Sequence, residues 1–229
     1  MKITIRDQLP KTGFAGIREH RLVTDSRAFG HYKPTYGQEG LGQFVYLADA
    51  QFVPHGETRM HSHREIDVIS LMARGRVRHE GSLGHGTELP EGSIQVQRAG
   101  GEGFSHNEVN PDSVPNRMIQ MWVLPEKAGE DAGYKTYQPK TFGSLRIYGG
   151  TDNQTETFPG QTLIDILDLQ QDELFTMPEE SLLYVVDGTL ETEGTLLGEG
   201  TLLRGQSVSF TATSNARLIW VHLMSEVTR

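Results

Sequence analysis

The chain has 229 residues, a formal net charge of -9 at pH 7 and no cysteine. This length suits one large all-β domain or two small ones, and either can bury a hydrophobic core. The acidic balance argues against direct binding of nucleic acid or of anionic membranes. Without cysteine, the chain has no disulfide, no thiolate metal ligand and no cysteine nucleophile. Residues 1–8 lack the apolar segment of a signal peptide and no apolar run is long enough to span a membrane, so we expect a cytoplasmic protein.

Glycine and proline interrupt the sequence often, with 26 and 10 residues, and the runs between them are short and rich in Val, Ile, Leu, Phe and Tyr. Short β-prone runs separated by turn residues predict an all-β fold of the sandwich or barrel type. Residues 29–37 form an aromatic loop that either caps a barrel end or lines a pocket. In the first half, strands are expected at an alternating segment around Ile3 and Ile5 and at 43–53, 67–73, 76–80, 93–97, 104–110 and 117–124.

The second half repeats this pattern after a polar segment, 128–142, that is interrupted by Gly and Pro and is the best linker candidate. Residues 184–188 and 205–210 parallel residues 70–75 and 92–97, so the second half resembles a degenerate copy of the first. We therefore predict two β-barrel domains, at 1–127 and 143–229. The expected strands of the second are 144–148, 161–169, 181–186, 191–197, 205–211 and 217–223.

Two pairs of potential metal ligands have the spacing of neighbours on one strand face. His61 and His63 directly precede a β-prone run, and residues two apart in a strand project to the same side. By itself, such a pair is more often a surface or hydrogen-bonding feature than a metal site. His106 and Glu108 repeat the spacing later, and the separation leaves room for about three strands, enough to return to a neighbouring position in a small barrel.

Together the two pairs would offer three imidazole nitrogens and one carboxylate oxygen. Such a sulfur-free set suits Fe(II), Mn, Ni, Cu or Zn, and on an octahedral ion it leaves two positions open for substrate. The other histidines have simpler interpretations. His79 and His85 flank a predicted hairpin and are expected in solvent, His55 lies in a turn, His20 lies in an irregular region, His222 is a core or rim residue, and His31 is undecided in the aromatic loop.

Residues 56–75, with Gly56, His61, His63 and Gly75, resemble the first cupin motif, and residues 92–110 resemble the second. More narrowly, the chain resembles the pirin family over most of residues 20–150. The segments that carry this resemblance are His61-Ser-His-Arg, His79-Glu-Gly-Ser-Leu-Gly-His, residues 99–108 and Gln120-Met-Trp-Val-Leu-Pro.

The resemblance implies an all-β bicupin of two stacked barrels, or jelly rolls, with metal only in the N-terminal one. His61, His63, His106 and Glu108 fall on the family's four ligand positions, and residues 150–229 contain one histidine. Two features depart from the pattern. Asp67 stands where general cupins have a ligand glutamate, and we expect it either to orient a ligand histidine or to be a charge at a strand rim. The loop from Gly100 to Gly103 is longer than usual.

The same resemblance implies a quercetin 2,3-dioxygenase-type enzyme that opens a flavonol-like ring with O2, in which Glu108 is both ligand and base. The cofactor would be one divalent transition metal, with Fe(II) favoured over Ni, Mn, Cu, Co and Zn. A second possibility is a redox-responsive regulatory module whose metal controls binding of a protein partner. In a third, the metal only stabilises the barrel.

Overall fold

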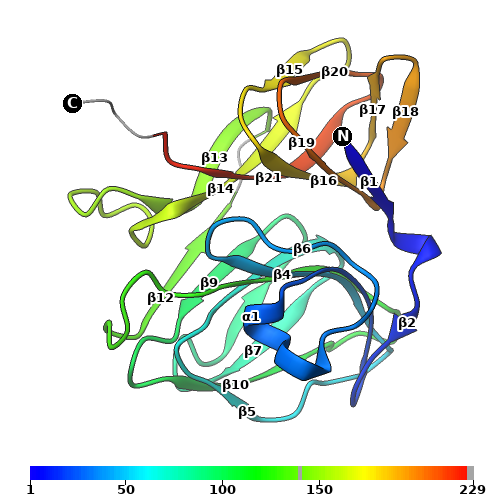
Figure 1. Ribbon diagram of the computed structural model, residues 1–229. Coiled ribbons are helices and arrows are strands. Elements are labelled where there is room, and N and C mark those ends of the chain that lie inside the picture. The colour runs from blue at the N-terminus through cyan, green and yellow to red at the C-terminus, as the bar shows by residue number, and fades with distance from the viewer. Residues whose placement is uncertain (139–140, 226–229) are drawn as a thin grey trace. The chain divides into compact units, whose positions relative to one another are not determined.

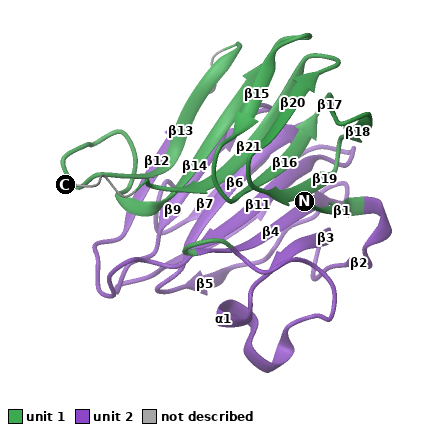
Figure 2. Cartoon of the chain, turned by 45° about the horizontal axis from the view of Figure 1, so that its top comes forward, with its two compact units in different colours: residues 1–6, 41–43, 139–229 green, residues 7–40, 44–138 purple. Residues whose placement is uncertain are grey.

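The structure is a computed structural model that describes residues 1–138 and 141–225. Its regular secondary structure is almost entirely β-strand, which confirms the predicted all-β fold. The chain divides into two compact units (Figure 2). Unit 2 contains residues 7–40 and 44–138, and unit 1 contains residues 1–6, 41–43 and the chain from 139 onward. Within the described ranges, no helix is long and apolar enough to cross a membrane.

Unit 2 is built from two antiparallel sheets (Figure 1). The larger has the order β12 (Gly133–Tyr137), β9 (Ile94–Arg98), β6 (Asp67–Arg74), β11 (Arg117–Val123), β4 (Phe44–Phe52), β3 (Ile17–Thr24) and β2 (Lys11–Thr12). The smaller has the order β5 (His61–His63), β10 (Phe104–Val109), β7 (Val77–Gly81) and β8 (Thr87–Leu89). The helical segments of the described chain are short: η1 (Arg6–Gln8), α1 (Ser26–Phe29) and η2 (Gly30–Tyr32).

Unit 1 also has two antiparallel sheets, around a core that includes Leu183, Leu203, Phe210 and Leu218. One has the order β1 (Lys2–Ile5), β19 (Thr201–Gly205), β16 (Ser181–Asp187), β21 (Ala216–Leu223), β14 (Gly160–Leu169) and β13 (Gly143–Gly150). The other has the order β15 (Leu174–Met177), β20 (Val208–Ala212), β17 (Thr189–Thr192) and β18 (Thr195–Gly198).

The interior of unit 2 contains a polar layer between apolar clusters. On β6, Val68, Ser70 and Met72 share one face because they are two residues apart. Met72 belongs to a buried cluster with Phe52 and Met118, and Val68 belongs to another with Ala99 and Phe104. Ser70 lies between them and is completely buried. Polar side chains at this depth need hydrogen-bond partners or a bound ion.

The segment predicted as a linker contains a strand. β12 pairs with β9 at the edge of the larger sheet of unit 2, with Lys135 opposite Val96. Just before this strand, the segment also forms a backbone hydrogen bond with the rest of unit 2: Gly101 N donates to Glu130 O over 2.9 Å. Residues 139 and 140 of the predicted linker lie outside the described residues. At the other end of the chain, β1 pairs with β19 of unit 1, with Ile3 opposite Leu203.

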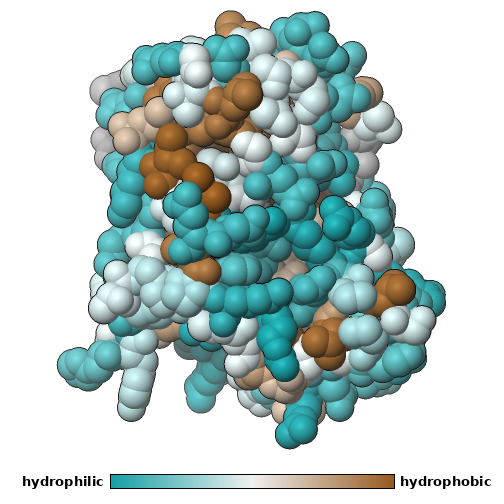
Figure 3. All heavy atoms as spheres, turned by 90° about the vertical axis from the view of Figure 1, so that its right-hand side faces the viewer, coloured by the Kyte–Doolittle hydropathy of each residue, from teal (hydrophilic) through white to brown (hydrophobic). Residues whose placement is uncertain are grey.

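The face of the molecule in Figure 3 is mainly hydrophilic, and hydrophobic side chains occur on it only in small groups. This surface agrees with the net charge of -9. Such a charge favours solubility, and it gives no support to a nucleic-acid interface.

Met72→Ala should destabilise unit 2 by about 2–5 kcal/mol, because its fully buried side chain leaves a cavity. The matched change Met60→Ala, at a side chain that is 58% exposed, should alter stability by no more than about 0.5 kcal/mol. Urea unfolding in a Trp220→Phe background, followed by Trp122 fluorescence, measures both. Equal effects of the two substitutions would contradict the described core.

Candidate metal centre

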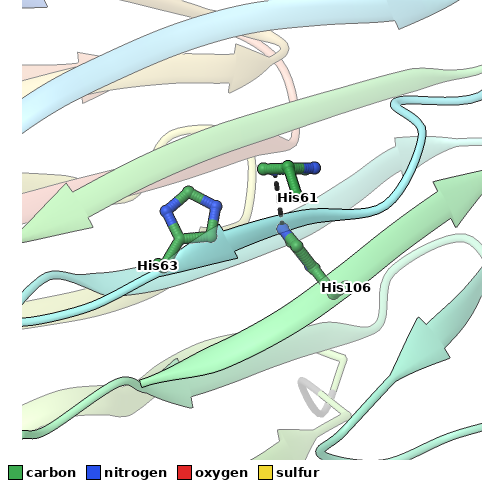
Figure 4. Close-up of side chains that lie close together, drawn as sticks. All are labelled: His61, His63 and His106. Atoms are coloured by element: carbon green, nitrogen blue, oxygen red, sulfur yellow. Dashed lines mark hydrogen bonds between the residues drawn. The ribbon is translucent and has the colours of Figure 1, made fainter. Parts of the chain in front are cut away.

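Strands β5 and β10 bring three histidines together in unit 2. The strands are antiparallel neighbours, with His61 opposite His106 and His63 opposite Phe104. Because side chains alternate along a strand, His61, His63 and His106 all project to one face. Figure 4 shows the three imidazoles facing one another from these two strands.

Backbone conformation fixes where β5 begins and how closely β10 approaches it. Arg59, two residues before the strand, has a φ of 64°, and its carbonyl oxygen lies 2.8 Å from His61 Nδ1. Gly103, just before β10, has a φ of 79°. A Cβ at Gly103 would lie 2.6 Å from the carbonyl oxygen of His63, so this position requires glycine.

The three imidazoles are close enough to share one ion. Their ring centroids lie 4.5 Å apart for His61 and His106, 4.9 Å for His61 and His63, and 5.1 Å for His63 and His106. The Nε2 atoms of His61 and His106 are 3.1 Å apart, the contact drawn as a dashed line in Figure 4. One nitrogen from each histidine lies within 4.8 Å of the others.

The hydrogen bonds on the far sides of these rings indicate where the lone pairs point. A carbonyl oxygen only accepts, so His61 Nδ1 carries the proton that it donates to Arg59 O, and Nε2 presents a lone pair. The side-chain amide of Gln97 lies 3.2 Å from His106 Nδ1, and its Oε1 has no other partner. With that amide rotated by 180°, Oε1 accepts from Nδ1 and leaves a second lone pair facing the first.

The third nitrogen is Nε2 of His63. His63 Nε2 is buried and has no hydrogen-bond partner among the described residues. Burial, reinforced by His61, lowers the pKa of His63 to about 4, and burial together with the neighbouring histidines lowers the pKa of His106 to about 2. These two rings are therefore neutral at physiological pH, which is the form that binds metal.

Glu108 lies on the same face of β10 as His106. Residues of the larger sheet hold its carboxyl group. Its Oε1 accepts hydrogen bonds from Ser70 Oγ over 3.0 Å and from Gln95 Nε2 over 2.6 Å. Its Oε2 is buried without a partner. Burial raises the pKa of Glu108 to about 7, despite these two hydrogen bonds. The carboxyl group therefore has one free oxygen for a cation, and near neutral pH it exchanges a proton readily.

The structure distributes the four predicted ligands over two groups that share His106, and the second group also includes His79. The first consists of His61, His63 and His106, and the second consists of His79, His106 and Glu108. Placing His79 in solvent was wrong, because its side chain is completely buried. The charged residues Arg76, Arg78 and Glu80 alternate with Val77 and His79 in the sequence. Period-two alternation could therefore have placed His79 on the inner face of its strand. His85 is exposed, as expected.

Aromatic side chains form a wall beside the histidines. Trp122 stacks on Tyr46 with ring centroids 4.2 Å apart, and on Phe29 at 6.1 Å. The centroid of the Trp122 ring also lies 6.1 Å from that of His63, and its Nε1 is buried without a partner. Phe29 of the aromatic loop thus belongs to this wall, whereas Tyr32 of the same loop is 91% exposed.

Asp67 is buried rather than a charge at a strand rim, and its Oδ1 accepts a hydrogen bond from Ala99 N over 3.1 Å. This bond holds the end of β9 where the chain enters the loop at Gly100. A Cβ at Gly100 would lie 1.9 Å from Glu130 O, so the loop packs tightly against the segment before β12. Asp67 and this packing together fix the approach of the chain to β10.

Comparisons with known proteins agree with this fold. Residues 18–123 match the family model Pirin. A curated protein of Mycobacterium bovis is 30% identical over 138 residues, which cover 59% of this chain and 54% of that protein. The quercetin 2,3-dioxygenase of Escherichia coli K12 is 32% identical over 76 residues, or 33% of this chain and 32% of that protein. The chain thus spans about half the length, or less, of these curated relatives.

Solved structures with the same fold cover nearly the whole chain. Bacterial pirin YhhW from Escherichia coli, in complex with nickel(II), matches with a TM-score of 0.81 and 18% identity over 97% of this chain and 98% of that one. Quercetin 2,3-dioxygenase from Acinetobacter baumannii matches with a TM-score of 0.69 and 17% identity over 96% and 85%. The fold is that of an all-β bicupin with a candidate His/Glu metal site in unit 2. Residues 18–123, somewhat less than half of the chain, carry the match to the Pirin family.

Metal binding should weaken as the pH falls through about 7, because a proton on Glu108 then competes with the ion. The loss attributable to this residue is about tenfold in affinity per pH unit below 7. Titration of the protein with Ni(II) between pH 5.5 and 8 measures it. At about pH 6 or below, where Glu108 is protonated before the metal binds, the Glu108→Gln variant should release about one proton fewer on binding. Equal proton release by both proteins would contradict a role for this carboxylate.

His61→Ala should reduce the metal content of the purified protein strongly, because it removes one of three converging nitrogens. His85→Ala is the matched control, since His85 is exposed and lies outside both groups. Elemental analysis after identical metal loading compares them. Full occupancy in His61→Ala would refute the assignment of this residue.

Proposed function

We propose that this protein is a pirin-like, metal-dependent dioxygenase that opens the ring of a flavonol-like substrate with O2. The metal ligands would be His61, His63, His106 and Glu108, and Fe(II) is the favoured metal. The observation that carries the proposal is the presence of two groups of potential ligand atoms that share His106, one with His61 and His63 and the other with Glu108, beside an aromatic wall. Such atoms fit a cation with open positions, next to a surface for a flat substrate.

The aromatic wall supports a flat, polyphenolic substrate. Trp122 is partly exposed and stacks on the buried Tyr46, so it offers a ring face on which an aromatic substrate can stack. Trp122 Nε1 is a donor without an acceptor, so a substrate oxygen would satisfy it. Phe104, with its ring centroid 5.3 Å from that of His63, helps to keep the site apolar. The wall would therefore orient the ring and exclude water.

Glu108 is suited to receive a proton from a substrate hydroxyl group. Its Oε2 would ligate the metal and would become the acceptor when the carboxylate shifts its coordination, while Ser70 and Gln95 hold Oε1 in place. Burial raises the pKa of Glu108 to about 7 in the metal-free site, and a bound dication lowers this pKa and keeps the carboxylate ionised. When bound, a divalent transition metal supplies Lewis acidity toward substrate oxygens and redox chemistry toward O2.

The relatives support the same reaction class. The E. coli relative carries the name quercetin 2,3-dioxygenase, as does the A. baumannii structure with the same fold. The nickel(II) complex of YhhW shows that a bicupin of this fold binds a divalent transition metal. These proteins favour a small aromatic substrate and O2 over a protein-binding role for this site.

Protein loaded anaerobically with Fe(II), Mn(II), Co(II), Ni(II) or Cu(II) should consume quercetin when O2 is admitted, with loss of flavonol absorbance and release of carbon monoxide. Glu108→Gln should lower the rate per bound metal by about 100-fold or more, because it removes the base. Glu102→Gln, at an exposed glutamate before β10, is the control and should keep the native rate.

No carbon monoxide from any of the five forms, each shown to contain bound metal, would refute quercetinase activity and favour the regulatory alternative. Retention of the native rate per metal in Glu108→Gln would refute the role of Glu108 as the base. It would leave the rest of the proposal unaffected. Metal content is therefore measured on every sample.

A further inference from the structure

We propose that His79, His106 and Glu108 form an inner binding position for a divalent transition metal, distinct from the outer position defined by His61, His63 and His106. The inner position overlaps the outer one, so the protein holds one ion at a time. This inference concerns metal binding alone and does not depend on the proposed reaction.

His79 is directed at Glu108 by the pairing of their strands. β7 and β10 are antiparallel neighbours, with His79 directly opposite Glu108. Side chains at opposite positions of neighbouring strands lie on the same face. The His79 ring is completely buried and stacks on Tyr134, with ring centroids 5.6 Å apart and planes 27° apart. The ring is therefore held in place on the inner side of the sheet.

The tautomer of His79 directs a lone pair at the inner position. Its Nε2 lies 2.6 Å from the carbonyl oxygen of Leu83, which can only accept, so Nε2 carries the proton. Nδ1 then presents a lone pair. This atom is buried and has no hydrogen-bond partner among the described residues. The contact with Leu83 thus prepares His79 as a neutral metal ligand, in the way that outer hydrogen bonds orient histidines in metal sites.

Glu108 presents a second unpartnered acceptor to the same place. Oε2 is buried without a partner, while Oε1 is held by Ser70 and Gln95. Gln95 in turn accepts a hydrogen bond from Tyr134, the residue on which His79 stacks. The residues that hold the two acceptors in place, Tyr134 beside His79 and Gln95 beside Glu108, are therefore joined by a hydrogen bond. Two neighbouring buried acceptors without a donor are stabilised when a cation or a water molecule lies between them.

The separations suit a single ion after a small adjustment. One ligand atom from each of His79, His106 and Glu108 lies within 4.8 Å of the other two. Three ligand atoms that each lie about 2.1 Å from one ion are on average at most about 3.6 Å apart. Side-chain movements of up to about 0.7 Å at each residue therefore close the group around a metal.

Two ions cannot occupy both positions together. His106 belongs to both groups, so one imidazole would have to serve both ions. Glu108 is the only carboxylate in either group, and it would have to offset two dications at close range. The inner position therefore binds when the outer ligands are absent or disengaged.

Copper(II) is a suitable probe, because it binds imidazole strongly and its electron paramagnetic resonance spectrum reports coordinated nitrogens. In a His61→Ala/His63→Ala variant only the inner group remains. We expect this variant to bind about one equivalent of copper(II), with a spectrum of two imidazole nitrogens, from His79 and His106. Adding His79→Gln, whose amide can still donate to Leu83 O, should abolish this signal. Adding His85→Gln, at the exposed histidine of the same hairpin, should leave it unchanged.

Absence of bound copper in the His61→Ala/His63→Ala variant would overturn the proposal, and would indicate that water joins His79 to Glu108. A signal of one nitrogen, or one that His79→Gln leaves unchanged, would also overturn it, since the copper would then be adventitious. Circular dichroism of each variant checks folding. The His61→Ala/His63→Ala variant retains His79. Its spectrum therefore tests the inner position even if His79→Gln disturbs the fold. Failure of the dioxygenase assay would leave this result unaffected.

Discussion

The candidate site in unit 2 depends on burying hydrogen-bond acceptors that no donor of the described residues reaches. His63 Nε2, His79 Nδ1 and Glu108 Oε2 are all in this condition. An unsatisfied buried polar atom costs about 1–3 kcal/mol, so three such atoms in unit 2 reduce its stability substantially. A cation bound in either group of ligands would remove that cost for the lone pairs of that group. Metal binding and the stability of unit 2 are therefore coupled.

The surrounding structure maintains this arrangement. Met72 and Phe52 on one side and Phe104 on the other exclude water, which keeps His63 and His106 neutral and raises the pKa of Glu108. Polar partners such as Ser70 lie in the same strands as these apolar residues, so a rigid sheet positions them. The same strands that form the core thus also orient the ligands.

The two units share an architecture of paired antiparallel sheets but differ in their interiors. The core of unit 1 is formed mainly by leucine, with Phe210 and Met177. Its single histidine, His222, has its Nε2 only 2.8 Å from Asp165 Oδ2, so this ring already has a partner. A fold of this kind therefore does not specify a metal site by itself. Specific residues at inward positions do.

Period-two patterns in the sequence predicted much of the fold and most of the site. They placed His61 and His63 on one strand face and His106 and Glu108 on another, because the side-chain period of a strand is a fixed property of the backbone. The same rule, applied to the alternation of charge around His79, would have found that residue as well. It was missed because a hairpin next to it suggested exposure.

Other features depend on contacts between distant residues, which no local pattern specifies. The pairing of β1 with β19 joins segments at opposite ends of the sequence. β12 lies in a segment rich in turn residues, and it forms a strand only because β9 offers a free edge. The orientation of Glu108 is likewise set by Ser70 and Gln95, which belong to two other strands. Sequence spacing gives the face on which a ligand lies, but not the partners that hold it.

A crystal structure of the metal-loaded protein, with anomalous scattering recorded at the absorption edge of the metal, tests the central claim most directly. The account predicts one anomalous peak in unit 2, about 2.0–2.2 Å from one nitrogen each of His61, His63 and His106 and from an oxygen of Glu108. A metal bound elsewhere, with these four side chains left uncoordinated, would contradict it.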